Sequence, residues 1–161
     1  MTVDRPPEHG HVRPAVALGL TTAGFVALLI FGLGMTSLYL DEDVLAVPGL
    51  GQAPGITGTI FATGGFALCV GVGTRHPHPS YWLAAVTTLV VALAYPLGVW
   101  FGAVTSGADV AAATKAAGGV LTSWFGLVVA ASALICSWSA VALVRTSARR
   151  PRWPWENPDD E

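Results

Sequence analysis

Four long stretches of this sequence contain no charged side chain, and this feature constrains the fold more than any other. Asp, Glu, Lys and Arg are absent from residues 14–40, 44–74, 76–108 and 116–144, which are 27, 31, 33 and 29 residues long. A helix needs about 20 apolar residues to cross a hydrocarbon layer of about 30 Å. Each stretch is therefore long enough to span a membrane.

The composition excludes several classes of protein. Of the 161 residues, 53% are hydrophobic and only 11% are charged, whereas a soluble domain carries about 25% charged residues. This composition argues against a soluble enzyme, a disordered chain and a nucleic-acid binder with a broad basic face. The sequence predicts a lipid bilayer as the main partner and no nucleic acid.

The predicted fold is all-α, an integral membrane four-helix bundle formed by residues 14–144. We expect spans at about 15–39, 56–74, 81–103 and 120–144, with an N-terminal arm at 1–13 and a tail at 145–161. The first apolar run is too long for a secretory signal peptide, whose apolar core has about 7–15 residues. We therefore interpret it as a retained helix.

The predicted loops are rich in turn formers, and two of the spans contain helix-weakening residues. Residues 41–55 and 75–80 carry two Pro residues each, and 41–55 carries three Gly residues as well. The loop at 104–119 has a centre that favours a short surface helix, stopped by Gly118 and Gly119. The second span is glycine-rich, and Pro96 in the third predicts a kink.

The distribution of basic residues predicts the orientation. With the N-terminus inside and four spans, Lys115 is the only basic residue of the outer loops. The inner segments then contain all seven arginines, namely Arg5, Arg13, Arg75, Arg145, Arg149, Arg150 and Arg152. Because basic residues are retained on the cytoplasmic side, both termini are expected there.

Small residues at four-residue spacing indicate where helices pack closely in lipid. Such strings occur in the last three spans: Gly65, Cys69 and Gly73; Ala94, Gly98 and Gly102; and Ser132, Cys136 and Ala140. We interpret them mainly as contacts within the bundle. The alternative is a contact surface for a second copy or for another membrane protein.

The residue types that usually carry chemistry lie outside the predicted spans. Ionisable residues inside a membrane mark ion paths and proton relays, and none falls in a span. His9, His11, His76 and His78 lie in the arm and a loop, and Asp41 begins a run of three acids that ends the first span. Cys69 and Cys136 are interpreted as buried small residues. We predict no cofactor, no metal site and no catalytic residue.

The tail is the one distinctive motif. Arg149, Arg150 and Arg152 precede Trp153 and Trp155, which favours contact with anionic headgroups or with a cytoplasmic partner. The motif RPRWPWE and the four-span layout resemble a group of small actinobacterial membrane proteins of unknown function. The resemblance implies a bacterial inner membrane and supplies no activity.

Two functions remain open from the sequence. The first is a non-catalytic accessory or structural membrane component that packs with itself or with another membrane protein. The alternative is a small transport or channel component for an uncharged or weakly polar solute. The glycine-rich second span and Pro96 are its motivation, because together they offer residues that can line a path.

Overall fold

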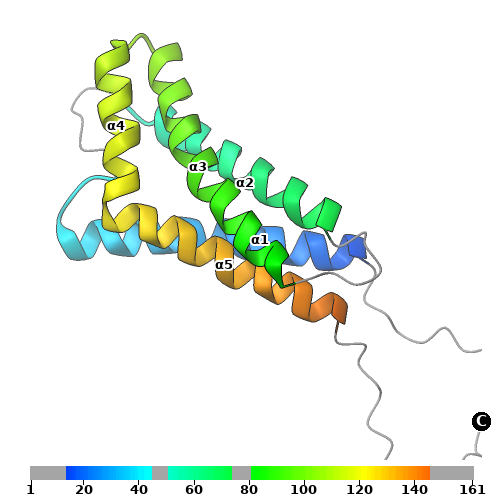
Figure 1. The fold of residues 1–161 in the computed structure, drawn as a ribbon. Helices are drawn as coiled ribbons and strands as arrows, with labels where there is room; N and C mark the ends of the chain where they lie inside the picture. Colours follow the sequence, from blue (N-terminus) through cyan, green and yellow to red (C-terminus); the bar gives the residue numbers. More distant parts are fainter. Residues whose placement is uncertain (1–13, 45–50, 74–80, 146–161) are drawn as a thin grey trace, which may run out of the picture.

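The computed structural model is all-α, and its four long apolar helices pack as a bundle. The structure describes residues 14–44, 51–73 and 81–145. Its helices are α1 (Pro14–Leu40), α2 (Ala53–Gly73), α3 (Trp82–Thr105), α4 (Val110–Thr122) and α5 (Trp124–Arg145) (Figure 1). All but α4 are long and apolar enough to cross a membrane. The predicted fold class is confirmed.

The helix ends are arranged as consecutive membrane crossings require. The start of α1, the end of α2, the start of α3 and the end of α5 lie at one end of the bundle (Figure 1). Tyr81, just before α3, lies there beside Trp138 of α5, with ring centroids 6.4 Å apart. Paired aromatic rings at one end of the spans fit an interfacial belt.

The short helix predicted within 104–119 is confirmed from Val110 onward, but the prediction that Gly118 and Gly119 stop it is wrong. Asp109 accepts a hydrogen bond from the backbone N–H of Ala111 and begins α4 as its N-cap. The helix continues through Gly118 and Gly119, because their exposed positions leave the buried face of α4 intact. That face consists of Ala113, Ala116 and Val120. The fourth span accordingly begins at Trp124 instead of residue 120.

The closest helix pair is α2 with α3, and glycine makes it possible. A Cβ on Gly98 would lie 2.7 Å from the backbone oxygen of Thr57 and 2.8 Å from the Cα of Gly58. A Cβ on Gly102 would overlap the hydroxyl of Thr57. That hydroxyl donates to the carbonyl of Gly98 across the interface, at 2.8 Å. Close backbone approach and one interhelical hydrogen bond therefore join the two helices.

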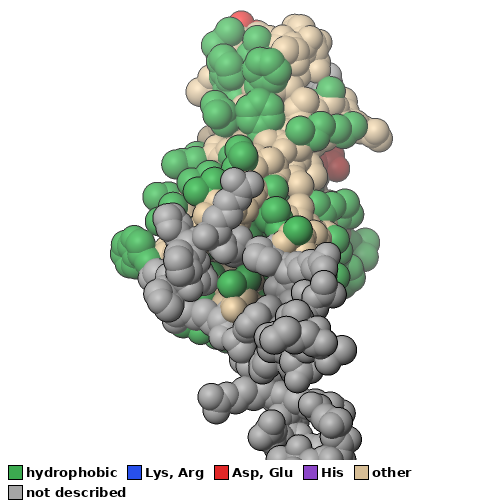
Figure 2. Space-filling view, turned by 90° about the vertical axis from the view of Figure 1, so that its right-hand side faces the viewer, with side chains coloured by type: hydrophobic (Ala, Val, Ile, Leu, Met, Phe, Trp, Pro, Cys, Tyr) green, Lys and Arg blue, Asp and Glu red, His purple; other side chains and the backbone are tan. Residues whose placement is uncertain are grey.

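A second pair, α1 with α5, packs against the first around a shared core. Phe25 of α1 stacks on Phe66 of α2, with centroids 4.6 Å apart and planes 4° apart. Val91 and Val99 of α3 and Val129 of α5 are also fully or almost fully buried. Apolar side chains dominate the coloured surface in Figure 2, and Leu38, Leu68 and Trp82 are at least 70% exposed. An apolar exterior of this kind suits lipid as the solvent.

We expect Gly98→Val to loosen the α2–α3 pair. The added side chain meets backbone of α2, which cannot move aside, and overpacking costs about 1–3 kcal/mol. The thermal unfolding midpoint in detergent should fall. Gly64→Val is the matched control, because no atom lies within 4 Å of its added Cβ. Equal midpoints for the two variants would contradict this packing.

Candidate functional site

The residues predicted for the tail lie outside the described part of the chain. Arg149, Arg150, Arg152, Trp153 and Trp155 all follow Arg145, where the described residues end. His9, His11, His76 and His78 also fall outside it. The interpretation of these residues as partner, lipid or solvent contacts therefore remains a prediction.

The acidic run after α1 acts as the end of the helix. Asp41 has a φ of 53°, the left-handed conformation that commonly closes a helix. The N–H of Glu42 then donates to the carbonyl of Ser37, and the hydroxyl of Ser37 donates to the carbonyl of Glu42 at 2.6 Å. Within residues 14–44, 51–73 and 81–145, no cluster of three metal-binding side chains occurs.

Both cysteines are free thiols within the spans. Cys136 is buried and Cys69 is partly buried. Cys136 belongs to the core shared by the helices, beside other small buried residues of α5 such as Ala133 and Ala140. Their positions agree with the interpretation of small packing residues.

The most unusual local structure is the junction between α4 and α5. The chain bends sharply between α4 and α5 (Figure 1). Ser123, between the two helices, has an extended backbone. Its hydroxyl donates to the carbonyl of Val120 at 3.0 Å, and the N–H of Gly126 donates to the carbonyl of Ser123 at 3.1 Å. A Cβ on Gly126 would overlap the carbonyl oxygen of Val120. Glycine at 126 therefore permits the bend.

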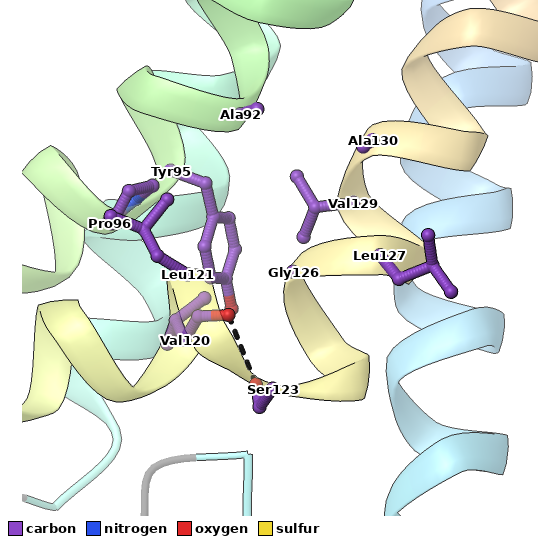
Figure 3. Close-up of a pocket in the computed structure, with 10 residues that line it drawn as sticks. All are labelled: Ala92, Tyr95, Pro96, Val120, Leu121, Ser123, Gly126, Leu127, Val129 and Ala130. Atoms are coloured by element: carbon purple, nitrogen blue, oxygen red, sulfur yellow. Dashed lines mark hydrogen bonds between the residues drawn. The ribbon is translucent and has the colours of Figure 1, made fainter.

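A pocket of about 310 Å³ lies between this junction and α3 (Figure 3). Three of its lining residues come from the centre of α3, and the others from the end of α4, the junction and the start of α5. The ten are Ala92, Tyr95, Pro96, Val120, Leu121, Ser123, Gly126, Leu127, Val129 and Ala130. We call this space the junction pocket.

The polar groups of the junction pocket are few and uncharged. Tyr95 is 1% exposed, and its ring extends from α3 into the pocket (Figure 3). The hydroxyls of Thr122 and Ser123 at the junction donate to carbonyls of α4, and no side-chain hydrogen bond among the described residues includes the Tyr95 hydroxyl. Pro96 has no N–H, so the carbonyl of Ala92 lacks its usual helical donor.

The arrangement of these groups can bind a small molecule. The lining contains no Asp, Glu, Lys, Arg, His or Cys, so its polar groups are the hydroxyls of Tyr95 and Ser123 and backbone carbonyls. It offers an apolar wall, one hydroxyl donor and several oxygen acceptors. Such a lining suits a neutral molecule that is mostly apolar.

Sequence reasoning missed the junction pocket. Pro96 was singled out, but its partners lie about 25–35 residues further along the chain, at an unpredicted helix boundary. The available signals were Ser123 and Gly126 at the start of an apolar run, a pattern that also fits an ordinary helix beginning. Only the tertiary approach of α3 to the bend creates the space.

Fold and surface together define a multi-pass membrane protein with a neutral pocket at a helix bend. No curated protein and no solved structure matches the chain. Residues 11–161 match the model of a family of unknown function, DUF6121, and the chain belongs to that family. The resemblance inferred from the tail and the layout is confirmed in two respects. The chain belongs to a family of unknown function, and its described residues include four long apolar helices.

We expect Gly126→Ala to disturb the bend because its methyl group overlaps the Val120 carbonyl oxygen. A loss of about 1–3 kcal/mol should lower the thermal unfolding midpoint in detergent. Gly119→Ala is the control, since no atom lies within 4 Å of its added Cβ. It should be neutral or stabilising by up to about 1 kcal/mol. A stable Gly126→Ala protein would refute the tight bend.

Proposed function

We propose that the protein is a non-catalytic accessory or structural component of the bacterial inner membrane, which packs with a second copy or with another membrane protein. The observation that carries this proposal is a row of small residues on the exposed side of α1. Ala15, Gly19, Ala23 and Ala27 follow one another at four-residue intervals, and all four are exposed. We call this row the α1 ridge.

The α1 ridge has the geometry of a helix-docking surface. No atom lies within 4 Å of a Cβ built on Gly19. Small residues at this spacing let a second helix approach closely in lipid, where no hydrophobic force drives association. Larger exposed residues flank the ridge, including Val16 at 51% and Leu20 at 62% exposed, and they offer side-chain contacts to an incoming helix.

The small-residue strings predicted from the sequence are used inside the bundle instead. Gly98 and Gly102 pack on α2, and Gly65 faces Val90 and Ala94 of α3. Ser132, Cys136 and Ala140 of α5 are buried as well. This contrast supports the α1 ridge as the surface left for a partner helix.

A non-catalytic role is supported by the placement of charge. Asp41, Glu42, Asp43, Asp109 and Lys115 all lie at helix ends or in α4, which is too short to span a bilayer. The seven-to-one division of basic residues supports cytoplasmic termini. On that side, Arg149, Arg150, Arg152, Trp153 and Trp155 would reach a cytoplasmic partner or the lipid headgroups. The actinobacterial source implied by the tail belongs to the same proposal.

A second candidate is a small transport component for an uncharged or weakly polar solute. The glycine-rich face of α2, which motivated this alternative, is occupied by α3 at Gly58 and Gly65. Its support now comes from the junction pocket beside Pro96. Solute flux into vesicles that contain only this chain would favour the second candidate over the first.

We expect Gly19→Leu to weaken association through the α1 ridge. The added side chain separates the helix backbones, and a loss of about 1.4 kcal/mol corresponds to roughly tenfold weaker association. Energy transfer between labelled copies in lipid vesicles measures self-association, and co-purification from native membranes measures a partner. Gly64→Leu, on an exposed part of α2, is the control. If Gly19→Leu matches wild type in both assays, the α1 ridge is not the docking surface.

The orientation can be tested with single cysteines in a protein that lacks Cys69 and Cys136. In intact cells, an impermeant maleimide should label Asp43→Cys but leave Tyr81→Cys unlabelled until the membrane is permeabilised. Both positions are exposed and lie at opposite ends of the spans. The reverse labelling pattern would place the termini outside.

A further inference from the structure

The junction pocket combines a buried hydroxyl, a space of suitable size and an opening at an apolar surface. Its volume of about 310 Å³ lies at the lower end of the ~300–1,000 Å³ typical of small-molecule sites. It is about twice the size of an apolar cavity of ~150 Å³ that admits benzene. A ring with a short alkyl chain would fit.

The Tyr95 hydroxyl makes the pocket more than an apolar gap. Tyr95 is 1% exposed, so its hydroxyl has little access to solvent around the protein. A buried polar group without a hydrogen-bond partner costs about 1–3 kcal/mol. Hydroxyls elsewhere in the spans commonly donate to the carbonyl four residues earlier, as Thr21, Thr59 and Thr88 do. Tyrosine cannot do so, because its hydroxyl lies too far from its own backbone.

A ligand hydroxyl can both accept and donate a hydrogen bond, and the polar groups around the pocket can pair with it in both ways. Tyr95 offers a donor. The hydroxyl oxygen of Ser123, whose proton is directed to Val120, offers an acceptor. The carbonyl of Ala92, four residues before Pro96, offers a second acceptor. A group that both accepts and donates one hydrogen bond would satisfy this set, and an alcohol or a phenol does so without charge.

The exposed side chains that border the pocket are apolar, as entry from the lipid side requires. Two of its lining residues, Leu121 and Leu127, are 52% and 57% exposed, so apolar side chains border its mouth. Tyr95 lies near the middle of α3, 13 residues after its first residue and ten before its last. At about 1.5 Å per residue, it is roughly 15–20 Å from either end of the helix.

We propose that the junction pocket binds an uncharged, lipid-soluble alcohol or phenol, which enters from the bilayer and pairs its hydroxyl with Tyr95. This assigns a ligand site to the protein, and it goes beyond an accessory role because it does not depend on association through the α1 ridge. An acyl chain of an ordinary lipid is the main competitor for the space, and it has no group to pair with Tyr95.

The test uses 4-butylphenol and butylbenzene, which differ by one hydroxyl. A butylphenol that carries a diazirine is photolysed with the full chain in lipid nanodiscs, and the labelled peptides are mapped by mass spectrometry. We expect label within residues 92–96 and 120–130. Unlabelled 4-butylphenol should compete at concentrations about three- to tenfold below those of butylbenzene, the range that one hydrogen bond supplies.

Three variants make the result specific. Tyr95→Phe keeps the ring and should remove the advantage of 4-butylphenol over butylbenzene. Ala92→Leu fills the pocket and should abolish labelling at both segments. Tyr39→Phe, the same chemical change at a position that is 90% exposed on α1, should behave like wild type. Unchanged thermal unfolding midpoints show that the variants are folded.

Several outcomes would overturn the proposal. Equal competition by the two compounds in wild type would show an apolar cavity that accepts acyl chains. A preference that survives Tyr95→Phe would assign the hydroxyl contact elsewhere. Label spread evenly over the lipid-facing helices, or label that Ala92→Leu does not reduce, would show that the junction pocket is not a binding site. None of these results bears on association through the α1 ridge.

Discussion

Close contact between two helix backbones, α2 and α3, is the interaction on which the rest of the bundle depends. Lipid offers no hydrophobic gain when helices associate, so contact area and interhelical hydrogen bonds must hold them together. Gly98 and Gly102 bring α3 against Pro54, Thr57 and Gly58 of α2. The same approach lets Thr57 donate to the carbonyl of Gly98. Once this pair is fixed, Tyr95 of α3 lines the junction pocket, and Phe66 of α2 stacks on Phe25 of α1.

Polar groups inside the bundle follow the same constraint, and the junction pocket stands apart from them. Most described Ser and Thr hydroxyls return a hydrogen bond to their own helix, and Ser137 is also within 3.5 Å of the carbonyl of Ala84 on α3. Three buried hydroxyls among the described residues, those of Thr22, Thr63 and Thr87, have no hydrogen-bond partner. Unlike Tyr95, none of them lines the pocket. The junction pocket is distinguished by the Tyr95 hydroxyl, which lies beside an open volume and takes part in no hydrogen bond among the described residues.

Charge placement and hydropathy were sufficient to predict the four long helices. Their ends coincide with charged or turn-forming residues, as at Leu40 before Asp41. The error at α4 has a physical cause: Gly118 and Gly119 suggested a helix end, whereas packing of Ala113, Ala116 and Val120 on the bundle outweighs their weak helix propensity. The junction pocket could not be predicted, because it requires α3 and the bend at Ser123 to meet in space. The four-residue spacing of small residues in the α1 ridge is visible in the sequence, but the sequence does not show that these residues are exposed.

The two functional surfaces lie on different elements. The α1 ridge belongs to the first helix, and the junction pocket to α3, α4 and α5. Both surfaces need lipid around the protein. The partner proposed for the α1 ridge is a helix within the bilayer, and the ligand proposed for the junction pocket is dissolved in the bilayer. Both proposals therefore require that the protein is integral to the membrane.

Alkaline carbonate extraction of membranes that contain the full chain tests this requirement most directly. The treatment strips proteins held by surface charge but leaves those whose helices cross the hydrocarbon layer. We predict that the chain stays in the membrane pellet and enters solution only when detergent is added. Release into the supernatant by carbonate alone would contradict it.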